Sequence, residues 1–387
     1  MDVLGVPPPA FMQDEDVVLF ADVVDRFYRK HAGPELCAKW REQGHVDRAL
    51  WEQAAKDGLL CASMPAEYGG GGGDYRHETI LSMVGIRLGV DGFALTLHNA
   101  IVAPYILAYG TEEQKQRWLP RMASGELIAA IAMTEPGTGS DLAAVKTTAR
   151  KDGNEYVING AKTFISNGQL ANLICVVAKT DPSAGGRGIS LIMLETDDAE
   201  GFRRGRNLDK VGCEAQDTSE LFFDDVRVPT ANLLGLEEGK GFRQLSAELA
   251  KERLTIALQA VAAMERALEE TIPYVKEREV FGQKLIEFQN TQFKLAECKT
   301  KAVIAKVFCD YCMGLLLEGK LDADTAAMAK YWATEAQGQV IDECVQLFGG
   351  YGYMDEYPIS RMYRDARVQR IYAGTNEIMK LVIARSL

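Results

Sequence analysis

The pattern of apolar and polar residues changes twice along the chain. Residues 14–125 follow a helical periodicity that glycines interrupt, residues 128–229 form short apolar runs between turn residues, and long helical runs return after Gly241. We therefore expect an α+β fold in three parts. These are an N-terminal α-helical domain at residues 1–127, a middle antiparallel β-sheet domain at 128–238 and a C-terminal four-helix bundle at 239–387.

The middle region predicts an antiparallel sheet, because no long helix separates its apolar runs. Strands are expected at 171–179, 188–195 and 219–223. Segment 155–165 predicts a β-hairpin, since Asn159-Gly160 readily adopts the positive φ angles of a tight turn.

The C-terminal region predicts a bundle. Three long amphipathic helices are expected at about 242–278, 288–318 and 322–348, with a shorter one from Glu377 to the end.

Composition narrows the class of protein. The 387 residues are 47% hydrophobic and 25% charged, as in ordinary globular enzymes, and a net charge of -12 argues against nucleic acid as a partner. No run approaches the roughly 18 apolar residues of a membrane span, and the first residues lack the basic segment of a targeting peptide. We expect a cytoplasmic protein.

The cysteines and histidines predict no metal site. Eight cysteines scattered through apolar segments favour reduced, buried thiols, and Cys309 and Cys312 lie mid-helix as packing residues. All four histidines precede residue 99 and lack metal-binding spacing.

Glu252 places a charge on an apolar stripe. At 3.6 residues per turn its carboxylate falls among Leu245, Leu249, Ile256 and Ala260. A carboxylate there must be paired or have a raised pKa. An ion pair with Arg253 or Lys251 is the simpler interpretation of the wheel, and a general base is the alternative.

Two segments could contact a planar polar ligand. Residues 131–141 leave a strand and enter a Gly-rich turn, which taken alone is only a loop. Phe164 and Ser166 lie two residues apart on one face of a strand, so they could cover a ring and hydrogen-bond its edge. The alternative is a buried Phe beside a turn-forming Ser.

Two later segments could bind phosphate groups. Arg278 to Gly282, followed by Phe288-Gln289, joins a cation, an aromatic ring and an amide, although Arg278 alone would suit a surface ion pair. Residues 346–353 and 371–378 contain clustered glycines, which allow the backbone to approach a ligand closely.

Together these segments resemble the acyl-CoA dehydrogenase family, from about Asp14 to the C-terminus. Five motifs lie in the family's order, including Lys210-Val211-Gly212 through Phe222 to Pro229. The resemblance implies an FAD flavoenzyme of fatty acid metabolism and β-oxidation that works as a homotetramer, and the chain indeed lacks the GxGxxG motif of other dinucleotide-binding proteins.

The resemblance also implies site residues. The isoalloxazine region of FAD would be contacted by Ile131, Met133, Thr134, Gly139, Ser140, Phe164, Ile165 and Ser166. The pyrophosphate and adenosine, partly across a subunit interface, would be held by Arg278, Phe281, Gln289, Gln346, Gly349, Gly350, Thr375, Asn376 and Glu377. The substrate would contact Ser140, Phe242, Arg243, Ala250, Lys251, Arg253, Ala373 and Gly374.

The position of the catalytic base distinguishes branches of this family. Most members carry a Glu directly after Ile-Tyr in the last motif, where this chain has Ala373. The long-chain and isovaleryl branches instead place the Glu before an Arg on the long helix, which matches Glu252-Arg253. By resemblance, Glu252 removes the α proton of an acyl-CoA, a hydride passes to FAD, and the backbone N–H of Ala373 meets the thioester oxygen.

The acyl group and the electron acceptor are less closely defined. We expect a medium-chain, long-chain or branched acyl-CoA and an electron-transfer flavoprotein as partner. Arg243 and Ala250-Lys251 depart from the long-chain pattern, and Arg243 could meet a polar acyl terminus or lie in solvent. A flavin oxidase or monooxygenase, or a non-catalytic flavoprotein, are the alternative functions.

Overall fold

Helices form the N-terminal part of this computed structural model, which describes residues 3–387. They are α1 (Glu15–His31), α2 (Pro34–Gln43), α3 (Arg48–Lys56), α4 (Tyr75–Leu88), α5 (Ala103–Tyr109) and α6 (Glu112–Ala123). Local sequence sets the start of α6, because Thr111 and Gln114 cap each other's backbone N–H groups. A π-helical turn at Leu97–Val102 leads directly into α5.

A seven-stranded sheet forms the middle part. Its strands are β1 (Ala129–Ala132), β2 (Thr148–Asp152), β3 (Glu155–Ser166), β4 (Leu173–Lys179), β5 (Ile189–Glu195), β6 (Phe202–Asn207) and β7 (Thr218–Pro229). The order is β1-β4-β2-β3-β7-β6, with β5 also paired to β4. Most pairs are antiparallel, as expected, while β4 runs parallel to β1 and β2.

The predicted hairpin at 155–165 is wrong. Residues Glu155–Ser166 form the single strand β3, and the chain reverses earlier, between the paired residues Asp152 and Glu155. Asn159-Gly160 marks an irregularity in the pairing of β3 with β7 instead of a turn. Gly160 is required there because a Cβ atom would lie 2.5 Å from Oγ1 of Thr147.

Long helices form the C-terminal part, as predicted. They are α7 (Gly241–Glu277), α8 (Gln289–Leu317) and α9 (Ala323–Phe348), joined by the short α10 (Pro358–Ala366) and α11 (Asn376–Ala384). A two-stranded ribbon of β8 (Glu279–Val280) and β9 (Gln283–Lys284) links α7 to α8. The short helix α10 was not predicted.

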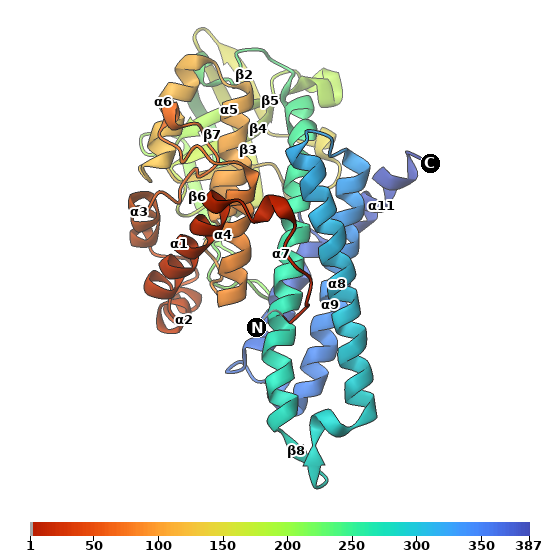
Figure 1. The fold of residues 1–387 in the computed structure, drawn as a ribbon. Coiled ribbons are helices and arrows are strands. Elements are labelled where there is room, and N and C mark those ends of the chain that lie inside the picture. Colours follow the sequence, from red (N-terminus) through yellow and green to blue (C-terminus); the bar gives the residue numbers. More distant parts are fainter. Residues whose placement is uncertain (1–2) are drawn as a thin grey trace.

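Helix α7 connects the three parts (Figure 1). It packs against α4, α5 and β5, and it also packs against α8 and α9 of the bundle, where Cys309 and Cys312 lie in the core. Alternating residues of β4 face opposite sides: Cys175 packs toward α5 and α6, and Val176 packs toward β3 and β7. None of the helices within residues 3–387 is both long and apolar enough to cross a membrane.

Candidate active site

Glu252 lies buried where α7 passes α5. Only 3% of its surface is exposed, and Leu245, Ile256 and Ala260 are buried on the same helix, as the helical wheel predicted. The hydroxyl of Tyr105 donates a hydrogen bond to Oε1 of Glu252 over 2.9 Å. The carboxylate is therefore held by a neutral partner from another helix.

No cation pairs with Glu252 among residues 3–387. Lys251 instead pairs with Glu248 at 2.9 Å, and the buried Arg253 has no oxygen of Glu252 within 4 Å. Burial raises the pKa of Glu252 to about 7, and the hydrogen bond from Tyr105 opposes this rise. The ion-pair interpretation of the sequence is thus wrong, and the carboxyl titrates in the range that suits a general base.

The loop at residues 373–375 approaches α7 at Arg253, the residue that follows Glu252. A Cβ atom built on Gly374 would lie 4.0 Å from Nη2 of Arg253. Lys330 of α9 anchors this loop, because its buried Nζ donates to the carbonyl of Gly374 and to Oδ1 of Asn376, each over 2.9 Å. Lys330 was not predicted as a site residue, although a lone lysine in the apolar run 326–333 was a usable signal.

An open face surrounds the Gly-rich turn after β1. Phe164 is 66% exposed at a positive φ of 60°, whereas its neighbour Ile165 is buried. The N–H of Thr163 donates to the carbonyl of Thr134, which ties this turn to β3. A Cβ at Gly139 would meet no atom within 4 Å. An exposed ring beside open backbone fits the isoalloxazine of FAD.

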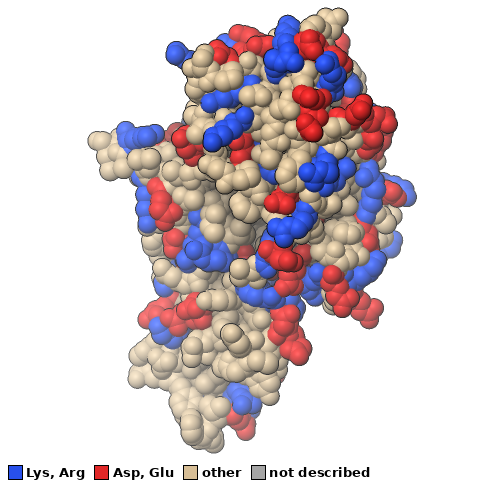
Figure 2. All heavy atoms as spheres, turned by 180° about the vertical axis from the view of Figure 1, so that it is seen from behind, with Lys and Arg blue, Asp and Glu red and all other residues tan. Residues whose placement is uncertain are grey.

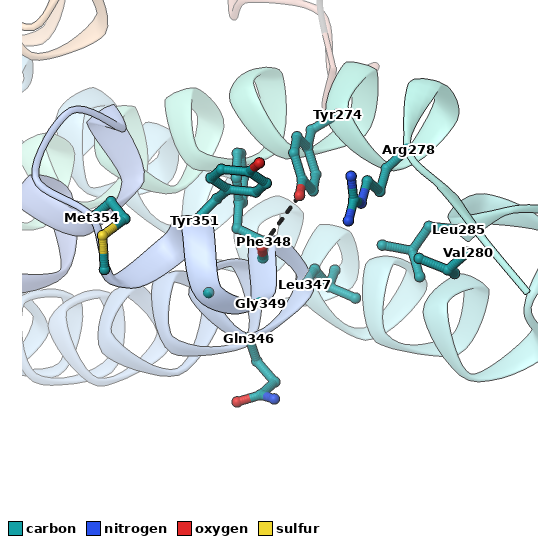
Figure 3. A pocket seen from close by; sticks show the side chains of 11 residues that line it. Tyr274, Arg278, Val280, Leu285, Gln346, Leu347, Phe348, Gly349, Tyr351 and Met354 are labelled. Carbon is teal, nitrogen blue, oxygen red and sulfur yellow. Dashed lines mark hydrogen bonds between the residues drawn. The ribbon is translucent and has the colours of Figure 1, made fainter.

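A cavity of about 610 Å³ opens at the far end of α7 (Figure 3). Cζ of Arg278 lies 5.8 Å from the ring centre of Tyr351. The hydroxyl of Tyr274 donates a hydrogen bond to the carbonyl of Phe348. Gly349 and Gly350 leave open space, since an added Cβ would meet no atom within 4 Å at either position. A cation, aromatic rings and open backbone fit a pyrophosphate with an adenosine.

The two regions lie far apart within one chain. From Glu252 to Glu277, 25 residues of α7 correspond to about 38 Å at 1.5 Å per residue. A single FAD cannot contact both ends of this helix in one subunit. The predicted cofactor residues at the two ends of α7 in one subunit therefore cannot contact the same FAD molecule.

The remaining predicted residues occupy varied positions. Asn376 is buried and its side chain bonds Lys330, Thr334 and Glu335, and the Thr375 hydroxyl caps α11. Ile131 and Arg253 are buried. Half-buried positions are Met133, Thr134, Ser166, Ala250, Lys251, Ala373 and Gly374. Exposed positions are Ser140, Phe242, Arg243, Phe281, Gln289, Gln346 and Glu377.

Comparison with known proteins agrees with this architecture. Three family models match: "Acyl-CoA dehydrogenase, N-terminal domain" at residues 14–126, "middle domain" at 130–226 and "C-terminal domain" at 239–387. The long-chain specific acyl-CoA dehydrogenase of Sus scrofa is 48% identical, over 97% of this chain and 87% of its own.

Solved structures give the same result. The acyl-CoA dehydrogenase of Geobacillus kaustophilus has a TM-score of 0.95 at 47% identity, over 98% of this chain and 99% of its own. A glutaryl-CoA dehydrogenase of Mycobacterium smegmatis in complex with FADH2 has a TM-score of 0.89 at 30% identity, over 97% of this chain and 95% of its own. The cofactor is FAD. The exposed face around Phe164 and the cavity beside Arg278 fit its two ends. The chain belongs to the acyl-CoA dehydrogenase family and is an oxidoreductase that acts on acyl-CoA.

Proposed function

We propose that this protein desaturates an acyl-CoA between its α and β carbons, giving a trans-2-enoyl-CoA, with Glu252 as the base. The observation that carries the proposal is a buried carboxyl with a pKa raised to about 7 that has no cation partner within residues 3–387. It lies on the part of α7 that the loop of Ala373 approaches at Arg253. A carboxyl in this state can accept a proton near neutral pH.

The chain's own residues move one proton. The α C–H bond breaks, the proton passes to an oxygen of Glu252, and the electron pair of that bond becomes the new C=C bond as the β hydrogen leaves as hydride. FAD supplies the hydride acceptor when it is bound. The backbone N–H of Ala373, on the loop that Lys330 anchors, donates to the thioester oxygen as negative charge builds there.

FAD binding in this proposal needs two copies of the chain. Phe164 and Ser166 contribute the flavin end in one subunit, and Arg278, Gln346 and Gly349 contribute the nucleotide end from a neighbour. The 38 Å length of α7 between these ends supports this arrangement. We infer a homotetramer, as the family resemblance implies.

The exposed surface supports such an assembly. Phe281 is 98% exposed, and Tyr353, Phe293 and Met354 are also exposed. Figure 2 shows few charged side chains at the lower end of the molecule, which is the end that carries β8 in Figure 1. An apolar surface of this kind is typical of a protein–protein contact.

We propose a long-chain or branched acyl group and an electron-transfer flavoprotein as the electron acceptor. Similarity to the long-chain specific enzyme supports the first point, and the position of Glu252 on α7 agrees with it. Similarity to a chain in the solved structure described as "Electron transferring flavoprotein of Acidaminococcus fermentans", at 38% identity and a TM-score of 0.89, supports the second. Arg243 is exposed, which favours a solvated side chain over contact with the acyl terminus.

Anaerobic titration with saturated acyl-CoAs of different lengths tests the function. We expect rapid bleaching of the flavin absorbance in the parent, and a loss of several orders of magnitude in that rate for Glu252→Gln with unchanged flavin content. Bleaching in Glu252→Gln within tenfold of the parent would reject Glu252 as the base. Absence of bleaching by any acyl-CoA would favour a non-catalytic flavoprotein, and rapid reoxidation by oxygen would favour an oxidase.

A further inference from the structure

Two tyrosines on α5 face two glutamates on α7. Tyr105 donates to Oε1 of Glu252 over 2.9 Å, and Tyr109 donates to Oε1 of Glu248 over 3.0 Å. The two tyrosines are four residues apart on α5, and the two glutamates are four residues apart on α7. Within each helix the two side chains therefore lie about one turn apart. The two hydrogen bonds are chemically alike, yet the carboxylates differ in what else they contact.

Both carboxylate oxygens of Glu248 accept hydrogen bonds, whereas within residues 3–387 only one oxygen of Glu252 does. Oε2 of Glu248 accepts a hydrogen bond from Lys251 over 2.9 Å. Within residues 3–387, Oε2 of Glu252 accepts no hydrogen bond and has no cation within 4 Å. Tyr105 therefore occupies one oxygen of the base and leaves the other available.

We propose that Tyr105 is a positioning residue for the dehydrogenation: its hydroxyl fixes Oε1 of Glu252 so that Oε2 takes the α proton. This inference rests on the proposed role of Glu252 as the base. A carboxylate on a helix can otherwise rotate about its side-chain torsions, and reaction rates depend strongly on how well the reacting atoms are oriented.

The same hydrogen bond tunes the base. Burial raises the pKa of Glu252, and Tyr105 is the strongest of the groups that lower it, ahead of Arg253 and Lys251, while Glu248 adds to the rise. From α4, the hydroxyl of Tyr75 bonds Thr255 and the carbonyl of Lys251, and the charges of Glu252 and Glu248 contribute to its raised pKa. From α9, Lys330 lies close enough to Arg253 that the charge of Arg253 helps to lower the pKa of Lys330. Burial and the nearby charge of Glu252 raise the pKa of Tyr105 far above its usual value, so it stays a donor at every working pH.

The test compares holoenzymes carrying Tyr105→Phe and Tyr109→Phe. We measure single-turnover flavin bleaching by an acyl-CoA against pH. Plotted against pH, the bleaching rate should rise as Glu252 loses its proton, and we call this rise the acidic limb. Because Tyr105→Phe loses a hydrogen bond to a charged group, its acidic limb should lie roughly one pH unit higher than that of the parent. Its maximal rate at high pH should also fall at least tenfold, with unchanged binding of an analogue that has sulfur in place of the β carbon.

Tyr109→Phe is the matched control, because Glu248 keeps Lys251 and Glu252 keeps Tyr105. It should lose a similar interhelical contact without moving the limb. If both variants shift the limb equally, or if Tyr105→Phe keeps the parent's limb and plateau, Tyr105 is only a contact between α5 and α7 and the proposal is overturned.

Two further measurements keep the outcome clear. Infrared titration of the carboxyl signal that Glu252→Gln removes should report a higher pKa in Tyr105→Phe, independently of activity. If Glu252→Gln stays active while this shift appears, the proposed base is wrong and the hydrogen bond is real. If Tyr105→Phe does not fold, 3-fluorotyrosine at position 105, a stronger donor, should move the limb to lower pH, and an unchanged limb would refute the proposal.

Discussion

Lys162 and Glu135 form a buried ion pair beneath the Gly-rich turn that follows β1, with Nζ and Oε1 2.9 Å apart. Lys162 also donates to the carbonyl of Met133. Glu135 accepts the backbone N–H groups of Lys146 and Thr147. Burial alone would raise the pKa of Glu135, but these hydrogen bonds and the charge of Lys162 hold it below its usual value. The pair thereby fixes the backbone on which the proposed isoalloxazine contacts depend.

Glu135→Ala should destabilise the protein strongly. It leaves the buried ammonium of Lys162 unpaired, which typically costs about 3–5 kcal/mol. Urea denaturation measures this loss. Asp152→Ala is the control, because it removes an exposed partner of Arg227 in the same sheet and should cost less than about 1 kcal/mol. Equal losses in the two variants would contradict a structural role for the buried pair.

Glu252→Gln should stabilise the protein at alkaline pH. The pKa of Glu252 is raised from 4.5 to about 7, so the folded state binds this proton more tightly than the unfolded state. That contribution to stability is fully present below pH 4.5 and is lost as pH rises through 7. Since Gln cannot ionise, the free energy of unfolding of the variant should exceed that of the parent by on the order of 3 kcal/mol at pH 8 and by little at pH 5.

Thermal unfolding at several pH values checks this, with Glu200→Gln on the exposed surface as the control. If the difference in thermal stability between Glu252→Gln and the parent does not change with pH, the pKa of the Glu252 carboxyl is not raised in the folded state.

Arg278→Ala should weaken FAD binding without unfolding the protein. Arg278 is exposed at the cavity beyond α7, and loss of one charge-assisted hydrogen bond to a phosphate corresponds to roughly 10- to 100-fold in Kd. Fluorescence titration of the apoprotein with FAD measures the effect. Lys276→Ala, an exposed cation that does not line the cavity, should bind FAD like the parent. Unaltered FAD affinity in Arg278→Ala would place the pyrophosphate elsewhere.

Lys330→Met should slow turnover while leaving stability nearly unchanged. Met fills a similar volume and removes a buried charge whose pKa burial lowers to about 8, but the carbonyl of Gly374 loses its donor. The Ala373 amide is then no longer fixed, so we expect kcat to fall about 10- to 100-fold, as for loss of an oriented oxyanion donor. Lys380→Met, at an exposed cation on α11, serves as the comparison in steady-state assays. A parental kcat in Lys330→Met would argue against anchoring of the loop.

Local sequence predicted much of the fold. Helical periodicity located α7, α8 and α9, and apolar runs located β4, β5 and β7, because these elements bury a regular face or are buried throughout. The same reasoning failed at Asn159-Gly160. Turn propensity there is outweighed by pairing of β3 with strands on both sides, which no local pattern reveals.

The sequence by itself determined that a carboxylate at position 252 lies on an apolar stripe, since helix geometry fixes which residues share a face. Only the tertiary structure decided what that carboxylate contacts. Arg253 and Lys251 are its neighbours in sequence, yet Tyr105, 147 positions away, holds it, and Lys330 anchors the loop that approaches Arg253. Such partners come from other helices, because packing brings together side chains whose separation along the chain carries no signal of their contact.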